Sequence, residues 1–168
     1  MKTLNPRTSE HEYFIKLAIL VSERATCLRR RTGAVFVKDG RPIVTGYNGT
    51  AEGMPHCDYY HPTKGCYVGN ENTASGSLAG HEICRAIHAE QNAILQAARI
   101  GISIYGSILY CTNEPCTHCT KLIGNLDVKE VYYFEEYNDS HARELREELG
   151  IVCTKIIPNV LGLFPYGE

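Results

Sequence analysis

The stretch HAEQNAI at residues 88–94, together with its distant partner PCTHC at residues 115–119, organises the chain. The two stretches supply one imidazole, two thiols and one carboxylate within easy reach of a single point. We expect each stretch to open a helix, because the dipoles of two helix N-termini that face one point favour thiolate and hydroxide there. The pair therefore predicts a metal site between two helix starts.

The spacing of the side chains agrees with this geometry. A helix turns about 100° per residue, so Cys116 and Cys119 share one helix face and can hold one ion. His88 and Glu90 are two residues apart, so they converge only if their helix begins near His88. Pro115 fits a helix start, where its missing N–H costs nothing.

Three protein ligands, His88, Cys116 and Cys119, would leave the fourth position of a zinc ion open for water, as in catalytic sites. Glu90 need not bind the ion and is free to move protons. The pattern H-x-E followed by P-C-x-x-C is the signature of zinc deaminases. The two cysteines alone would also fit a structural zinc knuckle or a redox pair, but neither of these has a use for Glu90.

Length, composition and charge narrow the class of protein. A chain of 168 residues fits a single domain over residues 1–168, and 43% hydrophobic with 21% charged residues is ordinary for a soluble protein. The net charge of −2 disfavours a nucleic-acid polymer as the main partner. No apolar run approaches the roughly 20 residues of a membrane span, and the start lacks a signal-peptide core. We expect a cytoplasmic protein without membrane contact, whose eight cysteines serve as metal ligands rather than disulfides.

Periodicity and capping signals predict an α/β fold. Helices are expected at residues 8–27, 88–99, 117–125 and 140–149, and strands at residues 33–38, 43–46, 107–112, 130–134 and 151–156. Asp39-Gly40 marks a two-residue hairpin, and Ser9 is a candidate helix cap. Strands that alternate with helices predict a five-stranded mixed sheet with helices on both faces.

A long irregular stretch, about residues 51–84, interrupts this alternation. A loop of that length in a compact domain is usually functional or tied down. Cysteines and histidines within and around it predict a second, closed and structural zinc site. The favoured ligands are Cys27, Cys57, His81 and Cys84, and Cys66 could displace one of them. Free buried thiols are the alternative.

Two short stretches admit both a structural and a functional interpretation. The basic run at residues 29–31 is either a solvated turn or a phosphate site just before the first strand. The GYNG stretch at residues 46–49 is either a turn or a substrate loop. In the second case Asn48 offers a donor and an acceptor to a sugar hydroxyl, and the flanking glycines permit close approach.

These motifs make the chain resemble the deoxycytidylate (dCMP) deaminases of the cytidine deaminase superfamily, the group that includes the late-competence operon deaminases. The resemblance spans about residues 13 to 152. The zinc motif identifies the superfamily, and the GYNG loop with the long insertion points to the deoxycytidylate branch. The stretches that carry it are CLRR at 27–30, GAV at 33–35, TGYNGT at 45–50, CRAIHAEQNAI at 84–94 and EPCTHC at 114–119.

The resemblance implies a three-layer cytidine deaminase-like fold and hydrolytic conversion of dCMP to dUMP for thymidylate synthesis. It implies His88, Cys116 and Cys119 as ligands of a catalytic zinc ion and Glu90 as the proton shuttle. In the implied mechanism, Glu90 takes a proton from the water that attacks C4 of the ring. It then passes protons to N3 and to the leaving ammonia.

The resemblance also implies regulation and assembly. Many family members are hexamers that dCTP with Mg²⁺ activates and dTTP inhibits. The residues implied for the substrate are Asn48 at the sugar and Tyr137 at the phosphate, and those for the effector are Arg29, Arg30, Gly46 and Tyr47.

Other functions remain open at this stage. The enzyme could be bifunctional for dCMP and dCTP, or could deaminate another cytosine nucleotide or base. Outside catalysis, the chain could be a zinc-stabilised module that senses nucleotides without turnover. Glu90 argues against the sensor, because a sensor needs no carboxylate beside an open zinc position.

Overall fold

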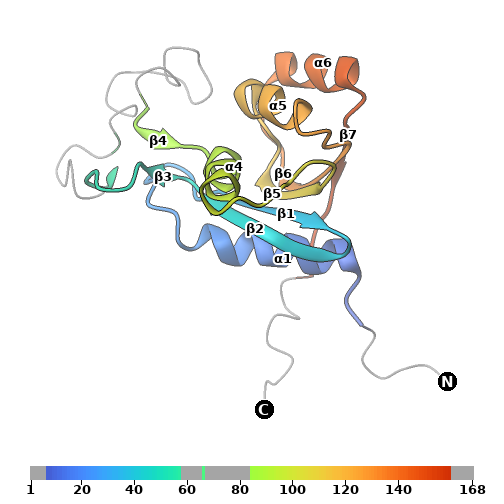
Figure 1. The fold of residues 1–168 in the computed structure, drawn as a ribbon, viewed down its shortest axis with the longest axis horizontal. Coiled ribbons are helices and arrows are strands. Elements are labelled where there is room, and N and C mark those ends of the chain that lie inside the picture. The colour runs from blue at the N-terminus through green and yellow to red at the C-terminus, as the bar shows by residue number, and fades with distance from the viewer. Residues whose placement is uncertain (1–6, 58–65, 67–83, 160–168) are drawn as a thin grey trace.

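The computed structural model describes residues 7–57, 66 and 84–159, and five of its strands form one mixed sheet in the order β2-β1-β5-β6-β7. Strand β1 pairs antiparallel with β2 and β5, whereas β5, β6 and β7 run parallel. Helix α1 lies along one face of the sheet, and α4 and α5 lie on the other (Figure 1). The predicted α/β fold with helices on both faces is confirmed.

The elements follow the predicted alternation along the chain. The helices are α1 (Glu10–Ser22), α4 (Ala89–Ile100), α5 (Thr117–Gly124) and α6 (Ser140–Leu149). The strands are β1 (Gly33–Lys38), β2 (Arg41–Tyr47), β3 (Gly49–Thr50), β4 (Ala86–Ile87), β5 (Ile108–Asn113), β6 (Glu130–Glu135) and β7 (Val152–Lys155).

The first helix begins as predicted and ends early. Ser9 caps its start, and the Ser9 hydroxyl accepts a hydrogen bond from the backbone N–H of Glu12 at 3.3 Å. The helix ends at Ser22, so the predicted end at residue 27 is wrong. The backbone N–H of Thr26 donates to the carbonyl oxygen of Asn48 at 3.2 Å, which turns the chain toward the GYNG loop.

Two buried clusters hold the layers together. On one face, Phe14, Ile15 and Ala18 of α1 pack against the sheet. On the other face, α4 contributes three fully buried alanines, Ala89, Ala93 and Ala97, and the partly buried Ile94 packs beside them. Small side chains allow α4 to lie close to β2, which places the start of α4 over the end of the sheet.

Gly46 in β2 makes that close approach possible. A Cβ atom at Gly46 would lie 2.3 Å from the carbonyl oxygen of Ala89 and 2.4 Å from the backbone nitrogen of Ala93. Only a residue without a side chain fits between β2 and α4. This contact fixes the height of the first turn of α4 above the sheet.

A small second sheet, which the sequence pattern did not predict, lies beside α4. Gly49 pairs with Ile87, and Thr50 pairs with Ala86, in antiparallel register. Each strand has two residues, too few for a recognisable alternation. The pairing ties the end of the GYNG loop to the residues that lead into His88.

Most of the predicted insertion at residues 51–84 lies outside the described residues, and His81 with it. Within the described ranges, no helix combines the length and apolar character that crossing a membrane requires.

Candidate active site

His88 is the N-cap of α4, as its spacing from Glu90 predicted. Its backbone N–H donates to the side-chain oxygen of Gln91 at 2.9 Å, which forms half of a capping box. Because the helix starts at His88, Glu90 falls in the first turn beside the imidazole instead of on the opposite side of the helix.

Cys116 is the N-cap of α5, and Cys119 lies in the first turn of that helix. Strand β5 ends at Asn113 and delivers this segment to the same end of the sheet as the start of α4. Pro115 stands one residue before the N-cap, and the helix begins at Thr117 as predicted.

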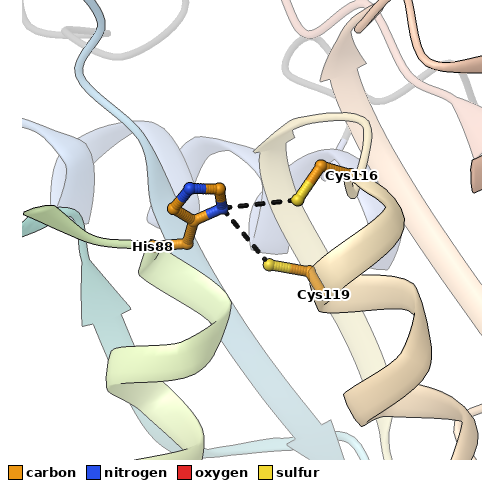
Figure 2. A group of neighbouring side chains, drawn as sticks. All are labelled: His88, Cys116 and Cys119. Carbon is orange, nitrogen blue, oxygen red and sulfur yellow. Dashed lines mark hydrogen bonds between the residues drawn. The ribbon is translucent and has the colours of Figure 1, made fainter. Parts of the chain in front are cut away.

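The imidazole and the two thiols converge (Figure 2). His88 Nδ1 lies 3.4 Å from Cys116 Sγ and 3.5 Å from Cys119 Sγ. All three ligand atoms lie within 4.8 Å of one another, and within the described ranges no other three such donors do. Tetrahedral zinc with ordinary Zn–N and Zn–S bonds separates nitrogen from sulfur by roughly 3.5 Å. The donor set therefore fits a zinc ion in both chemistry and size.

The electrostatics of this cluster favour a thiolate. Hydrogen bonds from Cys119 and His88 lower the pKa of Cys116 to about 4. The same hydrogen bond raises the pKa of its donor, Cys119, and burial raises it further. The contact with Cys116 raises the pKa of His88. The site thus holds one thiolate, Cys116, beside a second thiol and an imidazole, and a thiolate is the form of cysteine that binds a metal ion.

Glu90 is the buried carboxylate of the site, with only 4% of its surface exposed. Burial raises its pKa, and the negative charge of Cys116 raises it further. A carboxylate whose pKa is moved toward neutrality can both accept and return a proton, which is the requirement for general acid–base catalysis.

Asn48 fastens the GYNG loop to the basic run. Its Oδ1 accepts a hydrogen bond from the backbone N–H of Thr32 at 2.8 Å, and its Nδ2 donates to the carbonyl oxygen of Arg30 at 2.8 Å. An amide has two donor hydrogens and two lone pairs. Each half of the side chain therefore keeps one further hydrogen-bonding position, and the predicted contact with a sugar stays a prediction.

Arg30 and Tyr137 lie together. The guanidinium carbon of Arg30 stands 5.2 Å from the ring centroid of Tyr137. Burial raises the pKa of Tyr137, and the negative charge of Cys116 raises it further. The phenol of Tyr137 is therefore close enough to Cys116 to interact with its charge. The structure thus places Arg30, which was predicted for the effector, in contact with Tyr137, which was predicted for the substrate.

The remaining residues predicted for the effector differ in exposure. Arg29 and Tyr47 are exposed, and the carbonyl oxygen of Tyr47 accepts a hydrogen bond from Asn92 of α4 at 2.7 Å. Gly46 is buried under α4, so its visible role is the close packing described above. Their part in effector binding stays a prediction.

The cysteines predicted for the second zinc lie near one another. Burial raises the pKa of Cys57, and negative charge on Cys27, Cys84 and Cys66 raises it further. All four thiols are half-buried. The structure therefore gathers the four thiols without bringing three of them to the spacing found at His88. His81 lies outside the described residues.

Sequence reasoning missed the charged residues behind the cysteine segment. Glu114 and Arg146 form a buried ion pair of 2.5 Å, and Asp139 caps both α5 and α6. Two signals were available. Arg146 follows the buried Ala142 by four residues on the inner face of α6, and Asp139 stands directly before that helix, where capping residues are preferred.

Comparisons with known proteins agree with this site. Residues 8–135 match the cytidine and deoxycytidylate deaminase zinc-binding region. The chain is 36% identical over 151 residues to ComE operon protein 2 of Bacillus subtilis, covering 89% of this chain and 72% of that protein. It is 39% identical over 167 residues to the deoxycytidylate deaminase of Schizosaccharomyces pombe, covering 96% of this chain but 49%, about half, of the relative.

A solved structure gives the same result for the fold. The dCMP deaminase of cyanophage S-TIM5, in complex with dCMP and dUMP, superimposes with a TM-score of 0.71 at 30% sequence identity. The superposition covers 90% of this chain and 100% of the phage chain. The predicted cytidine deaminase-like fold is confirmed.

Proposed function

The chain belongs to the family of cytidine and deoxycytidylate deaminases, and from this premise we propose that it converts dCMP and water to dUMP and ammonia. The product would supply thymidylate synthesis. One observation carries the proposal: a buried carboxylate, Glu90, lies beside a histidine and two cysteines at zinc-site spacing. A closed structural site would need a fourth ligand and no such carboxylate.

The zinc ion would be held by His88, Cys116 and Cys119. When bound, zinc supplies a Lewis acid that lowers the pKa of a water molecule to about 7. The protein's own contribution is geometric. Two helix N-caps and the close packing of α4 on β2 fix the three donors, and Glu90 faces them from the first turn of α4.

Glu90 moves every proton of the reaction. It accepts a proton from the attacking water as the water oxygen bonds to C4, and it delivers that proton to N3. It then takes the proton of the new hydroxyl group and gives it to the amino group. The bond from C4 to the amino nitrogen breaks, ammonia leaves, and Glu90 returns to the carboxylate form.

The nucleotide would be recognised by the two loops that meet near the cysteines. Asn48 has one donor and one acceptor position left for the sugar. Tyr137 and Arg30 would bind the phosphate, because a phenol and a guanidinium in contact offer a donor and a positive charge together. The position of Tyr137 in the field of Cys116 supports its assignment to the substrate.

Effector control and assembly complete the proposal. We assign dCTP with Mg²⁺ as activator and dTTP as inhibitor to the surface formed by Arg29, Arg30, Gly46 and Tyr47, in a cytoplasmic homohexamer. Arg30 would take part in both sites. Its carbonyl oxygen is held by Asn48 and its guanidinium covers Tyr137, so a nucleotide bound at the basic run would act on the substrate loop.

A second, structural zinc ion would be held by Cys27, Cys57, His81 and Cys84, with Cys66 as the competing ligand. The mutual proximity of the four thiols supports this assignment. Such an ion would tie the insertion to the GYNG loop, because Cys27 follows Thr26, whose N–H binds Asn48.

Ammonia release from dCMP, dCTP and deoxycytidine, each with and without dCTP–Mg²⁺ or dTTP, tests the proposal. Turnover of dCMP that rises with dCTP and falls with dTTP is expected. Equal turnover of dCTP would favour a bifunctional enzyme. Zinc-loaded protein without turnover of any cytosine substrate would overturn the proposed reaction.

A further inference from the structure

A buried charged cluster stands directly behind the segment that carries the two metal cysteines. The side chains of Glu114 and Arg146 are 5% and 4% exposed, and their charged atoms lie 2.5 Å apart. Removing two charges from water is expensive, and a buried pair is often no more stabilising than well-packed apolar residues. Stability alone therefore does not explain why Glu114 and Arg146 form a buried ion pair at this place.

The guanidinium of Arg146 forms hydrogen bonds at both ends of the cysteine segment, residues 114–120, which carries Cys116 and Cys119. One terminal nitrogen binds the carboxylate of Glu114. The other donates to the carbonyl oxygen of Pro115 at 2.7 Å and to the hydroxyl of Thr120 at 3.4 Å. The two cysteines, Cys116 and Cys119, lie between these anchor points in the chain.

The nearby Arg143 shares the carboxylate of Glu114 with Arg146 but differs in its other contacts. It also binds Glu114, at 3.0 Å and 3.2 Å, and its side chain is 46% exposed. It donates as well to the carbonyl oxygen of Tyr137 at 3.4 Å. Among the described residues, its hydrogen bonds to the cysteine segment go to Glu114 alone, so it does not span the two sulfurs.

We propose that Arg146 is a positioning residue for the metal centre, which acts by holding the segment from Glu114 to Thr120 at the spacing that both sulfurs need. The proposal rests on the proposed zinc deaminase function. Arg146 touches neither substrate nor metal. Its guanidinium sets the backbone on either side of the two ligands. Arg143 binds Glu114 and the carbonyl oxygen of Tyr137, and none of its hydrogen bonds to the described residues goes to Pro115 or Thr120.

Lysine is the informative replacement. In Arg146→Lys, one ammonium group can pair with Glu114 but cannot reach the carbonyl of Pro115 and the hydroxyl of Thr120 at the same time. The buried carboxylate keeps a positive partner, so we expect the fold to be retained. The matched control is Arg143→Lys, which changes the other arginine on the same carboxylate.

The main readout is the absorption spectrum of the protein loaded with Co²⁺ in place of zinc, because its ligand-field bands report the geometry around the ion. We expect altered bands in Arg146→Lys and unchanged bands in Arg143→Lys. Cobalt bound elsewhere contributes equally to each spectrum. With zinc, kcat for dCMP should fall by about tenfold to a hundredfold in Arg146→Lys while KM stays within about twofold.

An Arg146→Lys protein with the wild-type cobalt spectrum and wild-type kcat, even at a lowered melting temperature, would overturn the proposal. If Arg146→Lys fails to fold, the double variant Glu114→Gln/Arg146→Gln removes both charges together, and the same spectral test decides. The cobalt spectrum does not depend on turnover. A wild-type protein that is inactive on dCMP would therefore refute the proposed function while the spectra still decide the role of Arg146.

Discussion

The guanidinium carbon of Arg30 lies 5.2 Å from the ring centroid of Tyr137. Arg30 comes from the turn before β1 and Tyr137 from the loop after β6, so the contact joins two segments that are far apart in the chain. Such a contact contributes about 0.5–2 kcal/mol, enough to hold a long side chain in one orientation. An orientated guanidinium beside a phenol is suited to bind a phosphate.

Loss of the Arg30 charge should therefore weaken the use of a phosphorylated substrate. In Arg30→Gln we expect kcat/KM for dCMP to fall by about tenfold to a hundredfold, the worth of one charged hydrogen bond. The value for deoxycytidine should change little, because that substrate has no phosphate. The exposed Arg41 at the start of β2 supplies the control, Arg41→Gln. Equal losses on both substrates would show that Arg30 acts through the loop structure instead.

Replacement of the buried carboxylate should separate metal binding from turnover. In Glu90→Gln we expect zinc content to stay unchanged, because Glu90 is not among the three donors, and kcat to fall by about a hundredfold to ten-thousandfold. Metal analysis and steady-state kinetics on the same preparation measure both effects. Glu52→Gln, which changes an exposed carboxylate, is the control. Substantial residual turnover would remove Glu90 from proton transfer.

The contact between β2 and α4 should tolerate no side chain. In Gly46→Ala the new Cβ atom would meet backbone atoms of Ala89 and Ala93 at 2.3 Å and 2.4 Å, so the start of α4 must shift. We expect a loss of about 1–3 kcal/mol or more in the free energy of unfolding. Denaturant unfolding measures it, with the exposed Thr45→Ser as control. A Gly46→Ala protein of wild-type stability would show that α4 can move freely on β2.

Much of this architecture could be predicted because its signals are local. The Asp39-Gly40 hairpin, the cap at Ser9 and the alternation of strands and helices each depend on neighbouring residues. The metal site was also predictable, since His88 and Glu90 can converge at that spacing only if the helix begins near His88. The close distance of His88 to Cys116 then followed from two helix starts at one end of a sheet.

The features that were missed depend on contacts between distant segments. The contact of Arg30 with Tyr137 follows from how two loops meet, and no spacing in the chain encodes it. The pairing of β3 with β4 involves too few residues to show a pattern. The hydrogen bond from Arg146 to the carbonyl oxygen of Pro115 could not be predicted either. The sequence places an arginine on the inner face of a helix, but it does not identify the partner of that arginine.

Acid should remove the stabilising effect of Asp139. Its carboxylate accepts hydrogen bonds from the backbone N–H of Thr117 at 2.9 Å and of Ala142 at 3.0 Å, so it caps α5 and α6 together. Burial acts to raise the pKa of Asp139, but these hydrogen bonds outweigh it and the pKa is lowered. A lowered pKa in the folded state means that the carboxylate stabilises the fold at neutral pH. The effect is lost as pH falls below the unfolded value of about 3.9 and through the folded value.

Asp139→Asn tests this directly. We expect it to lower the free energy of unfolding by about 1–2 kcal/mol at neutral pH, because an amide has one acceptor oxygen and can cap only one of the two helices. The difference from wild type should shrink as pH falls below about 4, because the carboxylate takes up a proton first in the unfolded chain and, at lower pH, in the folded chain as well. Glu148→Gln, on the exposed side of α6, is the control. A difference that stays constant down to low pH would show that the charge of Asp139 contributes nothing.

Zinc content should distinguish the two groups of cysteines. We expect two zinc ions per chain, because one donor set already has zinc-site spacing and the other gathers four thiols around Cys57. Cys116→Ser and Cys84→Ser should each lose about one ion, since a serine hydroxyl is a poor substitute for a thiolate ligand. Only Cys116→Ser removes a donor of the catalytic centre and should abolish turnover, whereas Cys84→Ser should lower the melting temperature.

Cys153→Ser is the control, because burial raises the pKa of that thiol to about 11 and keeps it protonated. One zinc ion per wild-type chain, unchanged in Cys84→Ser, would show that the second group consists of free thiols.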